Sequence, residues 1–235
     1  MTHSGQTVHV IGAGGHGKVV IRTLQEMGYT VTAIFDDAPQ THGTTLFGVP
    51  VEGSTARLAD LGKITAVIAI GDNAQRRRIA ESFELDWLQV IHPSAVVDRT
   101  VRLGCGVTIM AGAVVQADAL LGDHVIVNTS ASVDHDCRIG DYVHIAPGAR
   151  LAGAVSVGEG ALLGVGSVVL PGKAIGRWSV VGAAAAVTRD LPDGVVAMGS
   201  PAKPIRKMIP APPTSDQASQ ATLRRESNSQ PRTSS

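Results

Sequence analysis

From Ala95 onward the chain divides into six-residue blocks without a single insertion or deletion. The third residue of every block is Val, Leu or Ile, sixteen times in a row from Val97 to Val187. The residue two places earlier is mostly small, and the residue just after is often Gly. Such a repeat predicts a triangular coil, in which the aliphatic side chains point inward and the small residues and glycines fit near the bends.

Three blocks make one coil, so the sixteen blocks make about five coils. Stacked at the strand spacing of about 4.8 Å, they form a prism on the order of 25 Å long. A sandwich of short strands would instead show alternation with a period of two and irregular turns. A narrow aliphatic core also fits the composition, because 44% of the 235 residues are apolar and only 3% are aromatic.

Charge and cysteine content narrow the possible partners. Lys plus Arg and Asp plus Glu number 20 each, which leaves no field of one sign to attract nucleic acid or an anionic membrane. The two cysteines, Cys105 and Cys137, form no CxxC pair, as expected in a reducing compartment. The start of the sequence lacks a secretory pattern, and no long uncharged apolar run occurs. We therefore expect no nucleic-acid partner, no membrane insertion and a cytoplasmic location.

Residues 7–91 predict a compact α/β unit with a parallel sheet, because strand and helix patterns alternate. The expected strands are Thr7–Ile11, Thr30–Phe35, Ala66–Ile70 and Leu88–Ile91, and the expected helices are His16–Met27 and Asn73–Phe83. His92-Pro93 marks the change to the prism. We predict a Rossmann-like α/β domain at 1–92, an all-β prism domain at 93–209 and a disordered tail at 210–235, which has almost nothing to bury.

The segment Gly12–Gly17 fits the pattern G-x-G-x-x-G between a strand and a helix, and Asp36 and Asp37 follow about 20 residues later. This pattern is typical of dinucleotide binding. About 85 residues with four strands supply only half of the usual NAD-binding sheet, however. The same geometry can place the phosphates of a nucleotide sugar at the helix N-terminus, and a purely structural turn stays open.

Six motifs together resemble a known family over about residues 7–205. They are Val10-Ile11-Gly12-Ala13-Gly14-Gly15-His16-Gly17, Phe35-Asp36-Asp37, Ala69-Ile70-Gly71-Asp72-Asn73, Val127-Asn128-Thr129-Ser130, Val133-Asp134-His135-Asp136-Cys137 and Gly199-Ser200-Pro201-Ala202-Lys203. The chain resembles the left-handed β-helix hexapeptide-repeat acyltransferases, and within them the sialic-acid O-acetyltransferases and the bacillosamine- and perosamine-type sugar N-acetyltransferases. The resemblance implies a left-handed parallel β-helix, acetyl-CoA as co-substrate and homotrimers with active sites between subunits.

His135 is the candidate catalytic base. It lies two places after the inward Val133, so its imidazole should project outward, and an unperturbed histidine near pKa 6.5 suits proton transfer at neutral pH. The resemblance assigns Asp136 to orienting this imidazole, although many relatives carry the longer Glu there. Cys137 falls at a small inward position, where a buried, inert thiol is expected, so the transfer needs no covalent enzyme intermediate.

The resemblance implies roles for further residues. His144 would hydrogen-bond acetyl-CoA, and since it stands half a coil from His135, the two cannot easily meet within one chain. Gly153 would offer its N–H to the oxyanion, and the pantetheine arm would pair with Gly164, Val165, Gly182 and Ala183, the last replacing a glycine. The nucleotide sugar would contact Gly14, Gly15 and His16 with its phosphates or sugar, Asp36 and Asp37 with its nucleoside, and Gly71 with its base or ribose.

The leading prediction is acetyl transfer from acetyl-CoA to the amine of a nucleotide-activated amino sugar, such as a 4-amino-4,6-dideoxyhexose, in surface polysaccharide synthesis. O-acetylation of sialic acid or a related sugar is the alternative on the same fold. A non-catalytic hexapeptide-repeat scaffold is the alternative from another class. A β-helix carbonic anhydrase would need zinc-binding histidines, and the remaining histidines lack such spacing, so no metal is expected.

Overall fold

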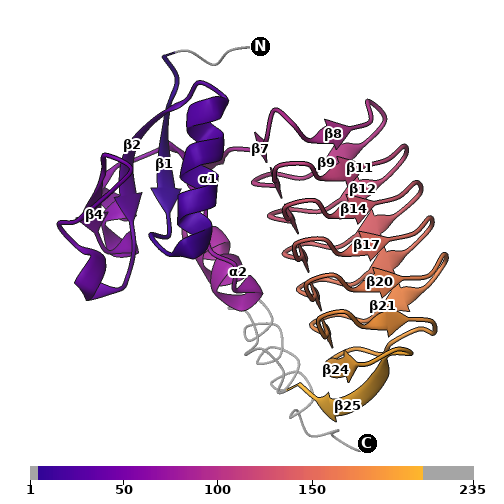
Figure 1. Ribbon diagram of the computed structural model, residues 1–235. Helices are drawn as coiled ribbons and strands as arrows, with labels where there is room; N and C mark the ends of the chain where they lie inside the picture. The colour runs from indigo at the N-terminus through magenta and orange to yellow at the C-terminus, as the bar shows by residue number, and fades with distance from the viewer. Residues whose placement is uncertain (1–4, 209–235) are drawn as a thin grey trace, which may run out of the picture.

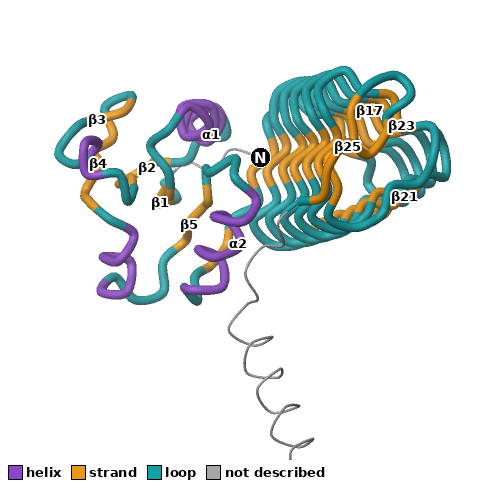
Figure 2. Tube along the Cα trace, turned by 90° about the horizontal axis from the view of Figure 1, so that it is seen from below, coloured by secondary structure: helices purple, strands orange, loops and turns teal. Residues whose placement is uncertain are grey.

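The computed structural model describes residues 5–208, which form an α/β unit and a prism of stacked coils lying side by side (Figure 1). The tail predicted to be disordered, 210–235, lies outside the described residues. Seen along the prism axis, the coils superimpose into a triangular outline with the α/β unit against one side (Figure 2).

The α/β unit is built on a six-stranded sheet in the order β3-β4-β2-β1-β5-β6. Its elements are β1 (Thr7–Ile11), α1 (Gly15–Glu26), β2 (Thr30–Phe35), η1 (Pro39–Thr41), β3 (Thr45–Leu46), β4 (Val49–Gly53), η2 (Thr55–Asp60), β5 (Thr65–Ile68), α2 (Asn73–Ser82) and β6 (Asp86–Trp87). The four central strands are parallel, and the prediction included three of them, β1, β2 and β5, in a parallel sheet. The antiparallel β3–β4 hairpin escaped the prediction, because its strands are short and Pro50 interrupts the pattern.

The single strand expected at Leu88–Ile91 is wrong, because the chain changes sheets within it. The Leu88 N–H bonds to the Ala66 carbonyl in the α/β sheet, whereas the Val90 N–H bonds to the Val107 carbonyl in the prism. Two-residue β6 pairs with β5, and β7 (Val90–Ile91) pairs with β10 (Thr108–Ile109). The prism therefore takes its first strand from residues that precede the predicted boundary at 92/93.

Three sheets form the faces of the prism, parallel except for the last strand of the first, and every coil but the last supplies a two-residue strand to each face. The first face contains β7, β10, β13 (Ile126–Val127), β16 (His144–Ile145), β19 (Leu162–Leu163), β22 (Val180–Val181), β24 (Val195–Met198) and the antiparallel β25 (Lys203–Lys207). The second contains β8 (Val96–Val97), β11 (Val114–Val115), β14 (Ser132–Val133), β17 (Arg150–Leu151), β20 (Val168–Val169) and β23 (Ala186–Val187). The third contains β9 (Arg102–Leu103), β12 (Leu120–Leu121), β15 (Arg138–Ile139), β18 (Ser156–Val157) and β21 (Ala174–Ile175).

The core of the prism confirms the repeat. Val115 pairs with Val133, and Val133 with Leu151, so each coil lies directly over the next. Every predicted inward residue from Ile109 to Val187 is buried. Cys137 also lies in this core, and burial raises the pKa of its thiol, as expected for an inert cysteine. This left-handed parallel β-helix is therefore held by an uninterrupted aliphatic column.

One corner of the prism carries an aromatic ladder that faces the α/β unit. His124, Tyr142 and Trp178 occupy equivalent corner positions with left-handed φ angles of 53°, 58° and 54°. The rings of His124 and Tyr142 stack with centroids 5.6 Å apart, and Trp87 meets His124 edge-on at 5.1 Å. Helix α2 lies against this corner and fixes the α/β unit to the coils.

Candidate active site

His135 lies on a prism corner between β14 and β15, and its side chain is 60% exposed, as its place in the repeat predicted. Its Nδ1 lies 2.8 Å from Asp136 Oδ2. A carboxylate only accepts, so Nδ1 carries the hydrogen and Nε2 is left as the free base. Asp136 holds a left-handed φ of 60°, which turns its side chain back toward the ring. The shorter aspartate thus makes the contact that the resemblance left in doubt.

The pKa of His135 is raised above its ordinary value of 6.5, chiefly by the hydrogen bond that its ring donates to Asp136 and then by the charge of Asp134. Gly153 lies one coil further on, directly against the imidazole. A Cβ at Gly153 would lie 2.5 Å from His135 Cε1, so only glycine leaves the ring in this position. Among the described residues the Gly153 N–H has no hydrogen-bond partner.

His144 lies on the first face of the prism and turns toward the α/β unit. Its Nδ1 is 3.2 Å from the Gly71 carbonyl oxygen, and its Nε2 is 3.0 Å from Asn128 Nδ2. The carbonyl only accepts, so Nδ1 donates and Nε2 accepts from the amide. The Thr129 N–H donates to Asn128 Oδ1, which fixes the amide in that orientation. A contact between His144 Nε2 and acetyl-CoA, which stays a prediction, would have to replace Asn128.

His16, Gly71, Asn128 and His144 together form a group that we call the histidine cluster. The rings of His16 and His144 have centroids 6.3 Å apart. His16 Nε2 is buried and has no hydrogen-bond partner among residues 5–208. The sequence analysis assigned His16 to the nucleotide sugar and His144 to acetyl-CoA. The structure places the two side chains next to each other within one chain.

Arg76 stands behind the histidine cluster and joins the two units. It is 1% exposed, and its guanidinium donates to the carbonyls of Ile70, His124 and Tyr142 and to Asn73 Oδ1. No carboxylate pairs with it in the described part of the chain. The clamp fixes residues 70–71, and therefore the Gly71 carbonyl that accepts the hydrogen bond from His144 Nδ1.

The histidines of this region are held neutral. Burial, reinforced by the charge of Arg76, lowers the pKa of His16 and of His144 from 6.5 to about 4. His124, in the aromatic ladder, shifts to about 4 for the same two reasons. The pKa of His135 is therefore shifted upward and the pKa values of the histidine cluster downward.

The glycine-rich turn leads from β1 into α1 in the predicted way. Gly17 packs so tightly on the Gly12 carbonyl that a Cβ would overlap its oxygen, which draws the helix onto the turn. Gly14 and Gly15 are exposed at the N-terminus of α1, where free N–H groups and the helix dipole favour an anion. Asp36 Oδ2 accepts from the Ala13 N–H at 2.6 Å, so this carboxylate braces the turn.

The main chain predicted to hold the pantetheine arm forms a ledge on one prism corner. Gly164 lies directly over Gly182 and Ala183, so close that a Cβ would lie 2.7 Å from the Ala183 nitrogen. Val165 is 56% exposed, and Ala183 is exposed as well. The replacement of a glycine by Ala183 leaves this ledge open.

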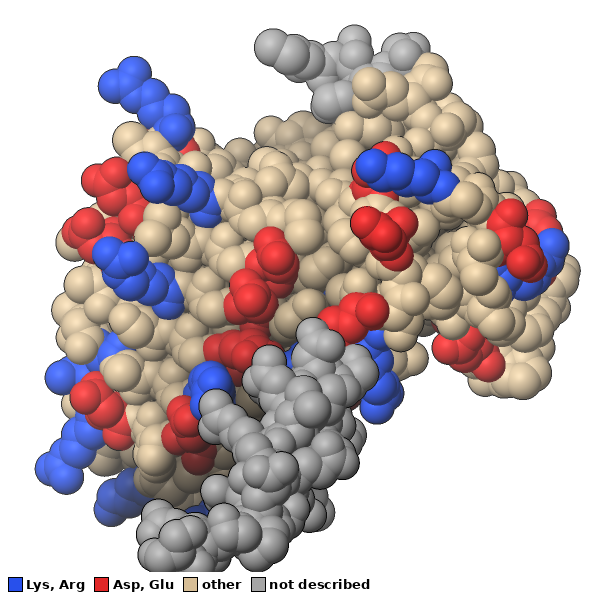
Figure 3. All heavy atoms as spheres, turned by 180° about the vertical axis from the view of Figure 1, so that it is seen from behind, with Lys and Arg blue, Asp and Glu red and all other residues tan. Residues whose placement is uncertain are grey.

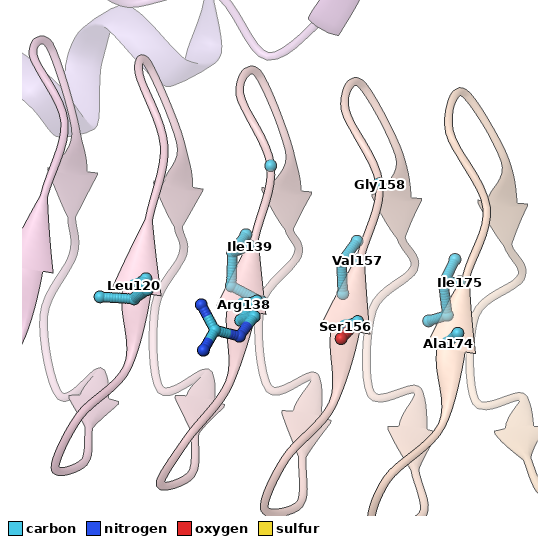
Figure 4. Close-up of a pocket in the computed structure, with 9 residues that line it drawn as sticks. Leu120, Arg138, Ile139, Ser156, Val157, Gly158, Ala174 and Ile175 are labelled. Carbon is cyan, nitrogen blue, oxygen red and sulfur yellow. The ribbon is translucent and has the colours of Figure 1, made fainter.

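The third face of the prism carries a depression away from the predicted site residues. A shallow depression of about 420 Å³ on the third face lies where small Ser156 and Ala174 follow Arg138, and none of the predicted site residues lines it (Figure 4).

Both positively and negatively charged side chains appear on the face of the molecule opposite to that in Figure 1 (Figure 3). Residues 5–208 contain no cluster of three metal-ligating side chains. In the same range no helix is long and apolar enough to cross a bilayer.

Comparison with known proteins finds two matching domain families and several similar solved structures. Residues 7–83 match the PglD N-terminal domain, and residues 118–153 match the bacterial transferase hexapeptide repeats. PerB from Caulobacter crescentus, in complex with CoA and GDP-perosamine, is 47% identical, covers 86% of this chain and 99% of its own, and superposes with a TM-score of 0.80. The acetyltransferase domain of PglB from Neisseria gonorrhoeae is 39% identical. The match covers 85% of this chain and 100% of the PglB domain, and the TM-score is also 0.80.

The chain belongs to the family of bacillosamine- and perosamine-type sugar N-acetyltransferases. A curated member, the UDP-N-acetylbacillosamine N-acetyltransferase of Bacillus subtilis, is 43% identical over 112 residues, which is 45% of this chain. The match spans about half of that relative, 52% of its length.

Sequence reasoning missed Arg76, Asn73 and Asn128 as residues that organise the site. One signal was available. In a chain with only 3% aromatic residues, Tyr142 and Trp178 stand at the same corner of the repeat as His124. Aromatic residues recurring at an exposed corner indicate a covered surface, and therefore the docking face of the α/β unit.

Proposed function

We propose that this protein is an acetyl-CoA-dependent N-acetyltransferase that acts on the amine of a nucleotide-linked amino sugar. The observation that carries the proposal is the His135–Asp136 pair, 2.8 Å apart on an exposed corner with Gly153 directly beneath the ring. A passive coil has no need of an oriented base with a raised pKa.

In the proposed reaction the sugar amine attacks the thioester carbonyl of acetyl-CoA. A C–N bond forms and His135 Nε2 takes a proton from the nitrogen, while Asp136 stabilises the imidazolium. The Gly153 N–H, which has no partner among the described residues, would donate to the oxyanion of the tetrahedral intermediate. The C–S bond then breaks, and the proton passes from His135 to the departing CoA thiolate. No acyl-enzyme forms, in keeping with the buried Cys137.

Two parts of the site receive the substrates. The ledge of Gly164, Val165, Gly182 and Ala183 would pair with the pantetheine arm of acetyl-CoA. Gly14, Gly15 and His16 would face the phosphates and sugar of the nucleotide sugar. The PglB domain in complex with acetyl coenzyme A, and PerB in complex with CoA and GDP-perosamine, support acetyl-CoA and a nucleotide amino sugar as the two substrates.

We propose a homotrimer with active sites between subunits. His135 and the histidine cluster lie on different parts of the prism, because His144 follows His135 by half a coil and turns toward the α/β unit. A second copy can bring one chain's His135 to the other chain's bound sugar.

The free thiols of Cys105 and Cys137 support a cytoplasmic location, and surface polysaccharide synthesis is the pathway we propose.

The decisive experiment is release of CoA thiol from acetyl-CoA with UDP-, GDP- and dTDP-linked 4-amino sugars and with sialic acid. We expect turnover with a nucleotide amino sugar and an amide in the product. An ester formed only on sialic acid would replace the proposal with O-acetylation. No turnover and no acetyl-CoA binding at millimolar concentration would favour a non-catalytic scaffold.

A further inference from the structure

Arg76 is connected to the histidine cluster through one main-chain carbonyl. Its Nη1 donates to the Ile70 carbonyl at 3.0 Å and to the Gly71 carbonyl at 3.4 Å. His144 Nδ1 lies 3.2 Å from the same Gly71 oxygen. A carbonyl oxygen has two lone pairs, so it can accept from the guanidinium and from the imidazole at once. Arg76 therefore acts on the His144 ring through the Gly71 carbonyl.

The Gly71 carbonyl has little else to hold it. Gly71 lies in the loop between β5 and α2, and no main-chain N–H donates to its oxygen in the described part of the chain. Arg76 reaches back to this loop from α2, five residues further along the chain. Without the guanidinium, the hydrogen bond from His144 would be the one contact left to orient this oxygen.

Arg76 is itself fixed by the contact between the two units. Its side chain is 1% exposed, and its Nε donates to the His124 carbonyl at 2.9 Å. Its Nη2 donates to the Tyr142 carbonyl at 2.7 Å and to Asn73 Oδ1 at 2.9 Å. A planar fork of five N–H groups can reach acceptors on several sides, which the single nitrogen of lysine cannot do.

The hydrogen bonds beyond Gly71 run in one direction. A carbonyl only accepts, so His144 Nδ1 carries the hydrogen. His144 Nε2 then accepts from Asn128 Nδ2 at 3.0 Å, and the Thr129 N–H holds Asn128 Oδ1 on the other side. The opposite tautomer would place a lone pair against the Gly71 oxygen and a hydrogen against the Asn128 amide. The tautomer of His144 is therefore fixed from both sides of the ring.

The charge of Arg76 acts in the same direction as its hydrogen bonds. Burial first, and then this charge, lower the pKa of His144 to about 4. A second proton on the ring would occupy Nε2 and remove the acceptor. His144 therefore keeps an unprotonated Nε2 in the neutral pH range.

We propose that Arg76 is a positioning residue for acetyl transfer, which acts through the Gly71 carbonyl to present His144 Nε2 as an acceptor to a hydrogen-bond donor of a substrate. The inference rests on the proposed function, because it concerns how that site receives its substrates. The amides of the pantetheine arm and the hydroxyls of the sugar are donors of this kind. The thioester carbonyl only accepts, so its oxygen is left to the Gly153 N–H.

Nitrogen NMR of the full-length protein at pH 7 tests the tautomer without any substitution. We expect the hydrogen of the His144 ring on Nδ1, with the signals assigned by their loss in His144→Gln. A hydrogen on Nε2 would overturn the inference. In Arg76→Lys we expect the His144 signals to move and to show a mixture of both tautomers. The ring of His135, on another corner of the prism, is the internal control and its signals should stay in place.

Steady-state kinetics of acetyl transfer then test the effect on the reaction. We expect Arg76→Lys to raise the KM of one substrate roughly 10-fold, the factor for one weakened hydrogen bond, and to change kcat less. A higher KM for acetyl-CoA would identify the pantetheine arm as the donor, and a higher KM for the nucleotide amino sugar would identify the sugar. Arg77→Lys, whose ion pairs with Glu81 and Glu159 lie next to Arg76 on α2, is the matched control and should keep both KM values.

A merely structural role of Arg76 gives a different result. If Arg76→Lys is folded by circular dichroism and keeps the wild-type His144 signals and both KM values, the inference is wrong, even when the free energy of unfolding falls. Arg76→Gln, which keeps two N–H donors and loses the charge, replaces it if the lysine variant does not fold. The NMR needs no turnover, so the expected tautomer and its loss in the variant, in a protein without acetyl transfer, would refute the proposed function alone.

Discussion

The exposed corner with His135 and the histidine cluster use the same side chain in opposite ways. At the corner a carboxylate 2.8 Å away raises the pKa of an exposed imidazole. In the cluster, burial and the charge of Arg76 lower the pKa of His16 and His144 to about 4. The first histidine is prepared to gain and lose a proton. The other two stay neutral across the neutral range, and His144 keeps its two hydrogen bonds there.

The largest expected effect comes from removing the exposed histidine. His135→Ala should lower kcat by roughly 10²–10⁴, because the amine then loses its proton to water. The unfolding midpoint in urea should hardly change, since the side chain is 60% exposed. Near-normal turnover would exclude His135 as the base, and the exposed corner would then have no catalytic role that sets it apart from the histidine cluster.

Arg76→Met tests the other region. The carbonyls of Ile70, His124 and Tyr142 would lose a charged donor in a buried place, so we expect the free energy of unfolding to fall by about 3 kcal/mol or more. Urea denaturation gives the value. Arg77→Met, which removes partly exposed ion pairs, is the neighbouring control and should cost less. An equal loss in both variants would contradict the clamp.

Acid should destabilise the fold through its buried histidines. The pKa of His16, His124 and His144 is about 4 in the folded state and 6.5 when unfolded. Between these values the unfolded chain binds more protons, so stability falls as pH drops, by about 2 kcal/mol per histidine from pH 6.5 to 5. Urea unfolding at pH 7 and 5 should show a smaller loss for His144→Gln than for wild type. Exposed His42→Gln should keep the wild-type loss, and an unchanged loss in His144→Gln would refute the shift.

Two glycines that face histidines sharpen the contrast. Gly153→Ala would place a Cβ 2.5 Å from His135 Cε1, and the exposed ring would swing away at little cost in stability. We expect kcat to fall by about 10-fold or more, by the loss of orientation. In Gly71→Ala the new Cβ would lie an ordinary 3.7 Å from His144 Cε1, so the NMR signals of His144 should not move. In Gly153→Ala, by contrast, the NMR signals of His135 should move. Unmoved His135 signals in Gly153→Ala would contradict the packing.

The smallest effect concerns pH. Asp136→Asn removes the main cause of the raised pKa of His135, so that pKa should fall and the neutral base should persist to lower pH. The acid limb of the kcat/KM profile should therefore shift to lower pH, with a modest drop in the plateau. A limb that stays in place would assign it to another group.

Much of the fold followed from local rules. The repeat placed Val133, Cys137 and Leu151 in the core, and it placed His135 outside, because position within a coil sets which way a side chain points. The α/β unit was predicted less completely. The β3–β4 hairpin and the change of sheet between Leu88 and Val90 depend on pairing with distant residues, which no local pattern records.

The histidine cluster marks the same limit. In the sequence Asn128 stood out only as part of a motif, and Arg76 did not stand out at all. Arg76 became a site residue because α2 docks on the aromatic corner, where it bonds to His124, 48 residues further along the chain. Asn128 became one because the coil places it beside His144. Polar groups buried by such docking must find partners, so their roles are settled by the interface.

The sequence by itself determined the prism, the exposed position of His135 and the family, because a six-residue period and short contiguous motifs are local properties. The tertiary structure decided the tautomer of His144, the burial of Arg76 and the meeting of His16 with His144. These three features depend on the contact between the α/β unit and the prism. Polar groups that are buried at this contact must form hydrogen bonds across it, and no local sequence pattern records those partners.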